Sequence, residues 1–376
     1  MRSAPLVLGL AVSPTWLRGA AWRDPGSRVE EMFDLAPYAE LAVAAEAAHL
    51  DFLFAPDAGH LDPGPLDRAP GFSTLDSHTL MTALAASTTR IGIVPTVQTL
   101  FASPFATARQ LMSLHQISRG RAGWNAVTAL GGSGNYDVDL PVGSDERTNR
   151  AGAFVDVVRE LWASYPASAL AVDRETGIFA DRDRVRALTP DGNPFGITGP
   201  NTLPVHAAGE PPLFQAGASA AGVAFAGAYA DVVFGAAASI DEARAQRKAL
   251  RAAASAAGRP SDAVRFLPGV VVTIADSTAE ADRIAARQDD GRGARHWSIT
   301  GTPTDAVAAV SRWAEADAID GCILLPGGTY GSIPRFLTEV VPILAKTGLA
   351  RSEYTGHTLV EHLRIGRSTD SAHADR

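Results

Sequence analysis

The sequence predicts an α/β fold, a (β/α)8 TIM-like barrel with loop insertions at its C-terminal face. Short β-rich apolar runs alternate with amphipathic segments along nearly the whole chain, which is typical of parallel strands joined by crossover helices. Eight such strand–helix units can be counted, and no evident linker divides the 376 residues. A closed barrel is favoured over an open sheet because closure leaves no parallel edge strand to protect.

Each predicted strand is a short apolar run, as expected for a strand that is buried on both faces. The predicted strands are 6–12, 52–55, 90–96, 122–127, 213–215, 232–235, 266–274 and 322–325. Apolar residues at helical spacing predict a helix after each strand. These helices are expected at 36–48, 77–87, 103–117, 145–162, 219–229, 241–257, 278–288 and 333–347.

The barrel is expected to be a single domain over residues 1–350, with insertions near 163–212 and 289–302 and a C-terminal tail over 351–376. Long segments without a periodic pattern also fall at 13–35 and 56–76. Loops of this length usually cover something in a compact domain, so we expect lids and walls over the barrel mouth. Plain surface insertions are the alternative for each of them.

Composition excludes several classes of function. A net charge of −8 and a pI near 5.6 provide no basic field for nucleic acid or for an anionic membrane surface. The single cysteine, Cys322, excludes a disulfide framework and a multi-thiolate metal site. His357 and His362 lie five apart, which is not the spacing of a zinc site, so no metal is expected. The apolar run 5–12 resembles a signal peptide but is interpreted as the first strand, so a cytoplasmic location is expected.

Polar side chains occur where three predicted strands end, and this edge of a barrel carries function. Asp57 follows the second strand, where an aspartate also serves as an ordinary turn or helix cap. Thr96 and Gln98 end the third strand, and Asn125 lies near the end of the fourth. Polar residues on a surface that usually carries aliphatic side chains indicate a ligand or ordered water.

The fifth strand ends in a turn of small residues before a helix. The segment reads Gln215-Ala216-Gly217-Ala218-Ser219, and the helix is expected to begin near Ser219. Small residues let backbone amides approach an anion, and a helix N-terminus carries partial positive charge, so a phosphate would suit this turn. An ordinary serine-capped helix is the alternative, and the spacing does not choose between them.

Several segments resemble one known family. The most specific are SRGRAGWNAVT at 118–128, FVDVVRELW at 154–162, QAGAS at 215–219, LPG at 267–269 and a series of matches between 340 and 363. Through almost its whole length the chain resembles the bacterial-luciferase-like flavin monooxygenases. Within them it resembles the nitrilotriacetate, EDTA, dibenzothiophene-sulfone and pristinamycin-synthesis branch.

The resemblance implies a two-component monooxygenase that uses reduced FMN and O2 to oxygenate a small organic substrate. It also implies a partner NAD(P)H:flavin reductase and a homodimer or homotetramer. By the same resemblance, Asp57 and Thr96 would lie near the flavin ring or ribityl chain. If a flavin is bound, Asn125 and Gln98 are expected to help to position its ring. Ser219, Ala218 and neighbouring amides would hold the phosphate. No catalytic residue can be assigned.

Two cofactor-site positions depart from the family pattern. The family commonly has a histidine and, four residues on, a tyrosine, where this chain has Ser144 and Thr148. Thr148 is shorter, so phosphate binding is expected to lose ~1 kcal/mol or to recruit a water. The departure leaves two alternatives open, an F420-dependent oxidoreductase on the same barrel and a non-catalytic flavin-binding paralogue.

Five aromatic and imidazole side chains in or next to the long loops could line a substrate space. They are Trp16, Trp22, His60, His296 and Trp297. An ordinary surface or core role is the alternative for each of them. His60 or His296 could also act as an acid or base, because imidazole titrates near neutrality.

Overall fold

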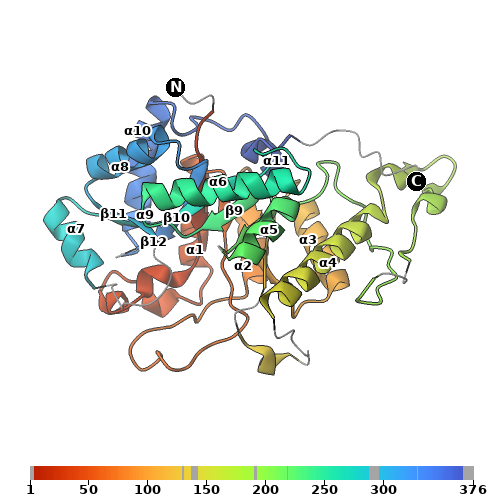
Figure 1. The fold of residues 1–376 in the computed structure, drawn as a ribbon, viewed down its shortest axis with the longest axis horizontal. Coiled ribbons are helices and arrows are strands. Elements are labelled where there is room, and N and C mark those ends of the chain that lie inside the picture. The colour runs from red at the N-terminus through yellow and green to blue at the C-terminus, as the bar shows by residue number, and fades with distance from the viewer. Residues whose placement is uncertain are drawn as a thin grey trace.

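The computed structural model describes residues 4–128, 131–136, 143–189, 193–217, 219–287, 296–327 and 329–366, with a parallel barrel at the centre and helices around it (Figure 1). The sheet contains β1 (Val7–Ala11), β2 (Phe52–Phe54), β3 (Gly92–Val94), β4 (Thr96–Gln98), β5 (Trp124–Val127), β8 (Leu213–Ala216), β9 (Val232–Gly235), β10 (Arg265–Ile274), β11 (Trp297–Gly301) and β12 (Gly321–Pro326). The hydrogen-bonded order is β3-β2-β1-β12-β10-β9-β8-β5-β4, with β11 beside β10.

The barrel closes because β3 and β4 are two parts of one strand. Only Pro95 separates them, and β3 pairs with β2 while β4 pairs with β5. Proline lacks the N–H group that a strand ladder needs, which interrupts the strand. The Pro95 carbonyl still accepts a hydrogen bond from the backbone N–H of Asn125 at 2.8 Å. Counting β3 and β4 once leaves nine strands, which are the eight predicted ones and β11, so the predicted fold class is confirmed.

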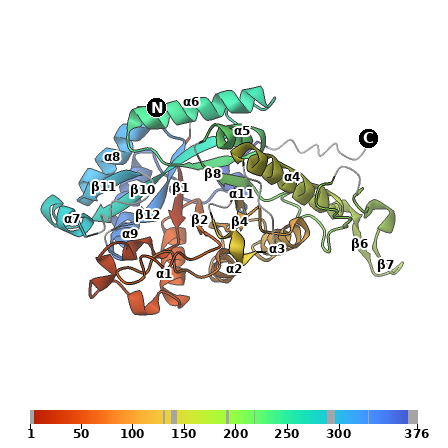
Figure 2. The same cartoon turned by 60° about the horizontal axis from the view of Figure 1, so that its bottom comes forward.

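Helices surround the barrel on the outside (Figures 1 and 2). They are α1 (Ala36–Ala47), α2 (Ser77–Ser87), α3 (Pro104–Ile117), α4 (Ser144–Ala163), α5 (Ala220–Tyr229), α6 (Ile240–Ala256), α7 (Thr278–Ala285), α8 (Pro303–Glu315), α9 (Ser332–Arg335), α10 (Val341–Lys346) and α11 (Leu359–Leu363). A π-helical segment, Phe336–Val340, joins α9 to α10, so the helix predicted at 333–347 is present in three parts. Within the described ranges, no helix is both long and apolar enough to cross a membrane.

One part of the sequence prediction was wrong. The segment 289–302 was expected to be loop, but it ends in β11, and α8 follows as an unpredicted helix. β11 pairs with the second half of β10, from Val270↔Trp297 to Ile274↔Gly301, beyond the point where β9 stops. The strand reads Trp-Ser-Ile-Thr-Gly and alternates buried with more exposed positions, so it lacks the continuous apolar run of a barrel strand.

The segment 163–212 carries a small antiparallel hairpin that the sequence did not predict. Its strands are β6 (Leu170–Asp173) and β7 (Ile178–Ala180), and Figure 2 shows them projecting beyond α4 at one end of the molecule. Every residue of β6 is exposed. The strands contain Leu170, Val172, Ile178 and Phe179, but they are only four and three residues long, which is too short for a periodic pattern to be recognised.

The described part of the C-terminal tail seals one end of the barrel. Leu359 and Leu363 of α11 are fully buried in a cluster with Val7, Phe52 and Phe214 from the strands. A Cβ atom at Gly92 would lie 2.5 Å from Leu359 Cδ1, so the close approach of α11 needs glycine there. The functional residues are therefore expected at the other end, where the strands terminate.

Candidate active site

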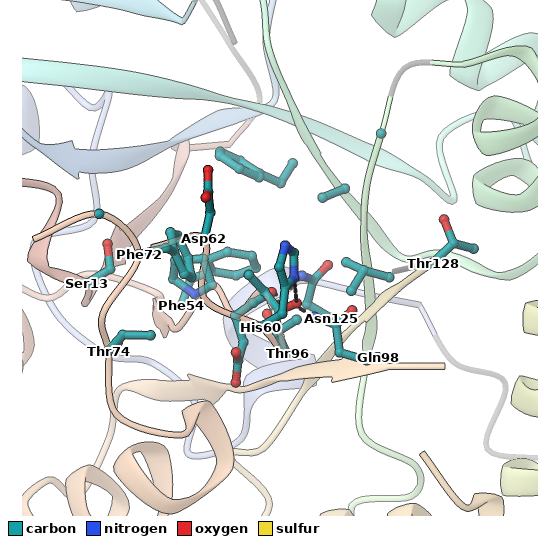
Figure 3. A pocket seen from close by; sticks show the side chains of 18 of the residues that line it. Ser13, Phe54, His60, Asp62, Phe72, Thr74, Thr96, Gln98, Asn125 and Thr128 are labelled. Atoms are coloured by element: carbon teal, nitrogen blue, oxygen red, sulfur yellow. Dashed lines mark hydrogen bonds between the residues drawn. The ribbon is translucent and has the colours of Figure 1, made fainter. Parts of the chain in front are cut away.

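A cavity of about 1210 Å³ lies at the carboxyl ends of the strands (Figure 3). The loops 13–35 and 56–76 form much of its wall, as expected for lids, whereas no described residue of 163–212 lines it. Its polar lining includes Asp57, Thr96, Gln98, Asn125, Ser144, Thr148, Gln215 and Ser219. The cavity therefore brings together every predicted cofactor residue except Ala218, which lies outside the described residues.

Thr96 and Asn125 lie side by side on β4 and β5 and are joined by a hydrogen bond. The Thr96 hydroxyl donates to the Ala55 carbonyl at 2.8 Å, so its oxygen accepts from Asn125 Nδ2 at 3.0 Å. This chain of bonds fixes the orientation of the Asn125 amide, because a hydroxyl has only one proton to donate. The amide oxygen Oδ1 is consequently the atom that remains for another partner.

Two amide oxygens at the cavity wall are buried without a hydrogen bond. They are Asn125 Oδ1 and Gln215 Oε1, on residues that are 2% and 6% exposed, and no described donor reaches either atom. Leaving a buried acceptor unpaired costs about 1–3 kcal/mol, so such groups normally have a partner. Both acceptors belong to residues of the same cavity, and together they suit a ligand that carries N–H donors.

Asp57 has a structural role in the loop that follows β2. Its carboxylate accepts from Gly59 N at 3.0 Å and from Ser77 N at 3.2 Å, and its carbonyl accepts from Gln98 Nε2 at 2.8 Å. These bonds tie the strand end to the start of α2. The cap interpretation of Asp57 is therefore supported, and Asp57 also lines the cavity.

The turn after β8 has the features of both interpretations that the sequence left open. Ser219 Oγ accepts from Gly222 N at 3.1 Å, which makes Ser219 the N-cap of α5. Gly217 has a φ of +151°, a backbone conformation that only glycine adopts readily. The remaining first-turn amides have no partner within the helix, so capping leaves the turn able to receive an anion.

The first turns of α4 contribute to the same cavity as the α5 N-terminus. Ser144, Arg147 and Thr148 all line it, together with Ser219. The Thr148 hydroxyl donates to the Ser144 carbonyl at 3.0 Å, so its proton is used within the helix. Arg147 adds a guanidinium group that the sequence analysis did not single out, because an arginine in an amphipathic helix usually belongs to its solvated face.

Of the two histidines proposed for the substrate space, only His60 lines the cavity. Its Nδ1 lies 3.0 Å from the Ala58 carbonyl, and since a carbonyl only accepts, Nδ1 carries the proton in this contact. His296 instead stacks on Phe234, with ring centroids 5.5 Å apart. Burial lowers the pKa of His296, and the nearby Arg18 lowers it further.

Two of the tryptophans proposed for the substrate space, Trp22 and Trp297, have other roles in the structure. Trp297 is buried in β11 and stacks on Trp313 of α8 at 4.1 Å, so its core alternative is correct. Trp22 Nε1 donates to the Arg68 carbonyl at 2.7 Å and thereby joins the two loops over the cavity. The side chain of Trp16 lies outside the described part of the structure.

Comparison with known proteins agrees with this fold. Residues 15–325 match the model of the luciferase-like monooxygenase family. N-acetyl-S-(2-succino)cysteine monooxygenase of Bacillus subtilis is 29% identical, over 95% of this chain and 96% of that protein. Nitrilotriacetate monooxygenase component A of Aminobacter aminovorans is 28% identical, over 97% of both.

Solved structures show the same similarity. A riboflavin lyase, crystallised with modified FMN and the substrate riboflavin, superposes with a TM-score of 0.87 at 27% identity, covering 96% of this chain and 95% of that one. Long-chain alkane monooxygenase superposes with a TM-score of 0.89 at 22% identity, covering 96% of each chain, and supports the fold alone. The match over most of its length shows that this chain belongs to the luciferase-like monooxygenase family.

Proposed function

We propose that the protein is the oxygenase component of a two-component flavin-dependent monooxygenase. It would take reduced FMN from a separate NAD(P)H:flavin reductase and use O2 to oxygenate a small organic substrate. The observation that carries this proposal is the pair of unpaired amide acceptors, Asn125 Oδ1 and Gln215 Oε1, in a cavity that also contains an anion-suited turn. Relatives named as monooxygenases, one of them a "component A", support it.

The residues present fit the ring of a flavin. The ring system offers N–H donors. Asn125 Oδ1 and Gln215 Oε1 are buried acceptors that have no donor. Thr96 holds the Asn125 amide in place, so the acceptor is preorganised. In this proposal Asn125 and Gln215 bind the ring, Thr96 orients Asn125, and Asp57 maintains the loop beside them.

The residues also fit the phosphate end of FMN. The α5 N-terminus at Ser219 offers backbone amides, and Arg147 on α4 offers a guanidinium group in the same cavity. In this proposal Ser144 and Thr148 line the phosphate region, and the Thr148 hydroxyl, which donates to the Ser144 carbonyl, does not replace the family's tyrosine as a donor. Arg147 then contributes the main side-chain charge at this end.

Reduced flavin supplies the electrons with which O2 is activated and one oxygen atom is transferred to the substrate. The task of this chain is to orient the flavin and the substrate and to exclude water. Leu17, Phe54, Phe72, Phe225 and Phe234 give the cavity apolar walls, and the Trp22–Arg68 bond holds its two covering loops together. In this proposal His60, whose imidazole lines the cavity, is a candidate to take up or return a proton.

The two other functions that the sequence left open are less well supported. F420-dependent enzymes share the barrel, but at 15–16% identity that likeness concerns the fold alone. A non-catalytic paralogue would not need a cavity that extends beyond the proposed flavin site towards the loops 13–35 and 56–76. A homodimer or homotetramer and a cytoplasmic location stay predictions.

An anaerobic titration tests the proposal. The purified protein is titrated with photoreduced FMN and, separately, with reduced F420, and the FMN complex is then mixed with O2. We expect tight binding of reduced FMN only, and a slower return of oxidised-flavin absorption than in protein-free buffer. Selective binding of reduced F420 would favour the F420-dependent oxidoreductase instead. Oxidation of the bound FMN at the protein-free rate would support the non-catalytic alternative.

A further inference from the structure

We propose that three arginines near the cavity entrance, Arg18, Arg23 and Arg68, form a binding site for the carboxylate of an anionic organic substrate. All three line the cavity described above. The inference rests on the proposed function, since it assigns a substrate class to the same cavity. It goes beyond that function because the family fold and the flavin site do not determine the substrate's charge.

The three arginines come from two loops that the structure holds together. Arg18 and Arg23 lie in the loop after β1, and Arg68 lies in the loop after β2. Trp22 Nε1 donates to the Arg68 carbonyl at 2.7 Å, which places the second loop next to the first. The first loop is anchored from the other side by Arg287, which pairs with Asp24 at 2.6 Å. The arginines therefore belong to a defined arrangement.

The cavity has an excess of positive charge in an acidic protein. Its described lining residues include four arginines, Arg18, Arg23, Arg68 and Arg147, but only two acidic residues, Asp57 and Asp62, whereas the whole chain carries −8. Asp57 accepts two backbone N–H groups, and Asp62 Oδ1 accepts from Gly64 N at 2.9 Å. A concave surface of one sign attracts a ligand of the opposite sign.

Ion pairs with described residues do not consume the charge of Arg23 or Arg68. Asp24, the nearest acidic neighbour of Arg23 in the sequence, pairs with Arg287, and no ion pair with a described residue forms at Arg23. Among the described residues, Arg68 pairs with Asp67 alone, and their side chains are 76% and 70% exposed. An exposed pair of this kind contributes little, so a ligand carboxylate can compete for Arg68.

The rest of the cavity defines the body of the ligand. Apolar side chains, including Leu17, Phe72 and Phe234, line the space between the loops and the strand ends. Arginine presents paired N–H donors that match a carboxylate in a plane. Arg147 belongs to α4, whereas Arg18 and Arg23 belong to the loop after β1, so the phosphate and the substrate carboxylate are assigned cations from different elements. A carboxylic acid with a hydrocarbon or aromatic body fits this arrangement.

Calorimetric titration with a matched pair of probes tests the proposal. The probes are 4-phenylbutanoate and its neutral analogue 4-phenylbutanamide, each titrated into the purified protein with and without FMN, at low and at high salt. The variants are Arg23→Gln and Arg68→Gln, and the control is Arg182→Gln, whose side chain is 94% exposed on the distant insertion. We expect the carboxylate to bind about tenfold more tightly than the amide, and more weakly at high salt.

The variants give the second half of the test. Arg23→Gln and Arg68→Gln should each weaken carboxylate binding about tenfold and leave amide binding unchanged, while Arg182→Gln should change neither. Equal affinities of the two probes, no binding of the carboxylate, or an unchanged carboxylate affinity in both variants would overturn the proposal. FMN binding is measured in the same samples, so a protein that binds the carboxylate but not FMN would reject the flavin function and not the arginine site.

Discussion

Asn125 donates through Nδ2 to the hydroxyl of Thr96 at 3.0 Å, and this bond leaves Asn125 Oδ1 as a buried acceptor without a partner. The two residues lie opposite each other in the register of β4 and β5. The barrel thus fixes the direction of one amide at the strand ends, and the proposed flavin site begins from it.

Replacing Asn125 by leucine tests the role of that acceptor. Asn125→Leu keeps the size of the side chain and removes Oδ1, so we expect the Kd for FMN to rise about tenfold. Thr96→Ser is the matched control, because it keeps the hydroxyl that orients Asn125, and it should leave the Kd near the wild-type value. Fluorescence titration measures both. An unchanged Kd in Asn125→Leu would mean that the flavin ring does not use this acceptor.

Arg147 is predicted to recognise the phosphate and not the ring. Arg147→Gln should weaken FMN binding about tenfold and leave riboflavin binding unchanged, because riboflavin lacks the phosphate that the guanidinium group would contact. The ratio of the two dissociation constants is the measurement, and it is insensitive to partial unfolding. An equal loss of affinity for both ligands would remove Arg147 from the phosphate site.

A substitution at Thr148 is predicted to tighten FMN binding. Its hydroxyl donates to the Ser144 carbonyl, so it has no proton left for a ligand. Thr148→Tyr restores the family's longer side chain and should tighten FMN binding by ~1 kcal/mol, about fivefold, with no gain for riboflavin. If Thr148→Tyr weakens FMN binding, the phosphate lies elsewhere in the cavity.

Leu359 is predicted to carry much of the stability at the sealed end of the barrel. It is fully buried between strands, so Leu359→Ala should lower the free energy of unfolding by about 2–5 kcal/mol. Ile343→Ala on α10 is the control, because that side chain is 41% exposed and should cost much less. Urea denaturation compares the two, and similar losses would contradict the packing described for α11.

His362 is predicted to make the fold sensitive to acid. Burial, with a smaller effect from Arg351, lowers the pKa of His362 from 6.5 to about 4 in the folded protein. Between these pH values the unfolded chain binds a proton there and the folded chain does not, so stability falls as the pH falls, by ~3 kcal/mol in total. The slope of Tm against pH from 6.5 to 4 should be smaller in His362→Phe. Equal slopes would show that His362 is not the group responsible.

The barrel and much of the proposed cofactor site were predictable from the sequence because their signals are strong. Continuous apolar runs marked the eight barrel strands, and polar residues such as Thr96 and Asn125 stood out at their ends. β11 was missed because Trp-Ser-Ile-Thr-Gly has too few apolar residues to differ from a loop. β11 is a strand because it pairs with β10 over five residues, and not because of its own composition.

The arginines of the cavity could not be assigned from the sequence for a different reason. Arg18, Arg23 and Arg68 lie in loops without any periodicity, and Arg147 lies on a helix where charge is ordinary. Only the folded chain shows that all four line one cavity. Gln215 was visible in the predicted turn, but its unpaired oxygen depends on the packing around it.

A crystal structure of the protein with FMN tests the central claim most directly. We predict that the flavin ring contacts Asn125 and Gln215, and that the phosphate lies between Arg147 and the N-terminus of α5. Flavin bound elsewhere, or a cavity in which the amide oxygens of Asn125 and Gln215 still have no ligand at saturating FMN, would contradict the account.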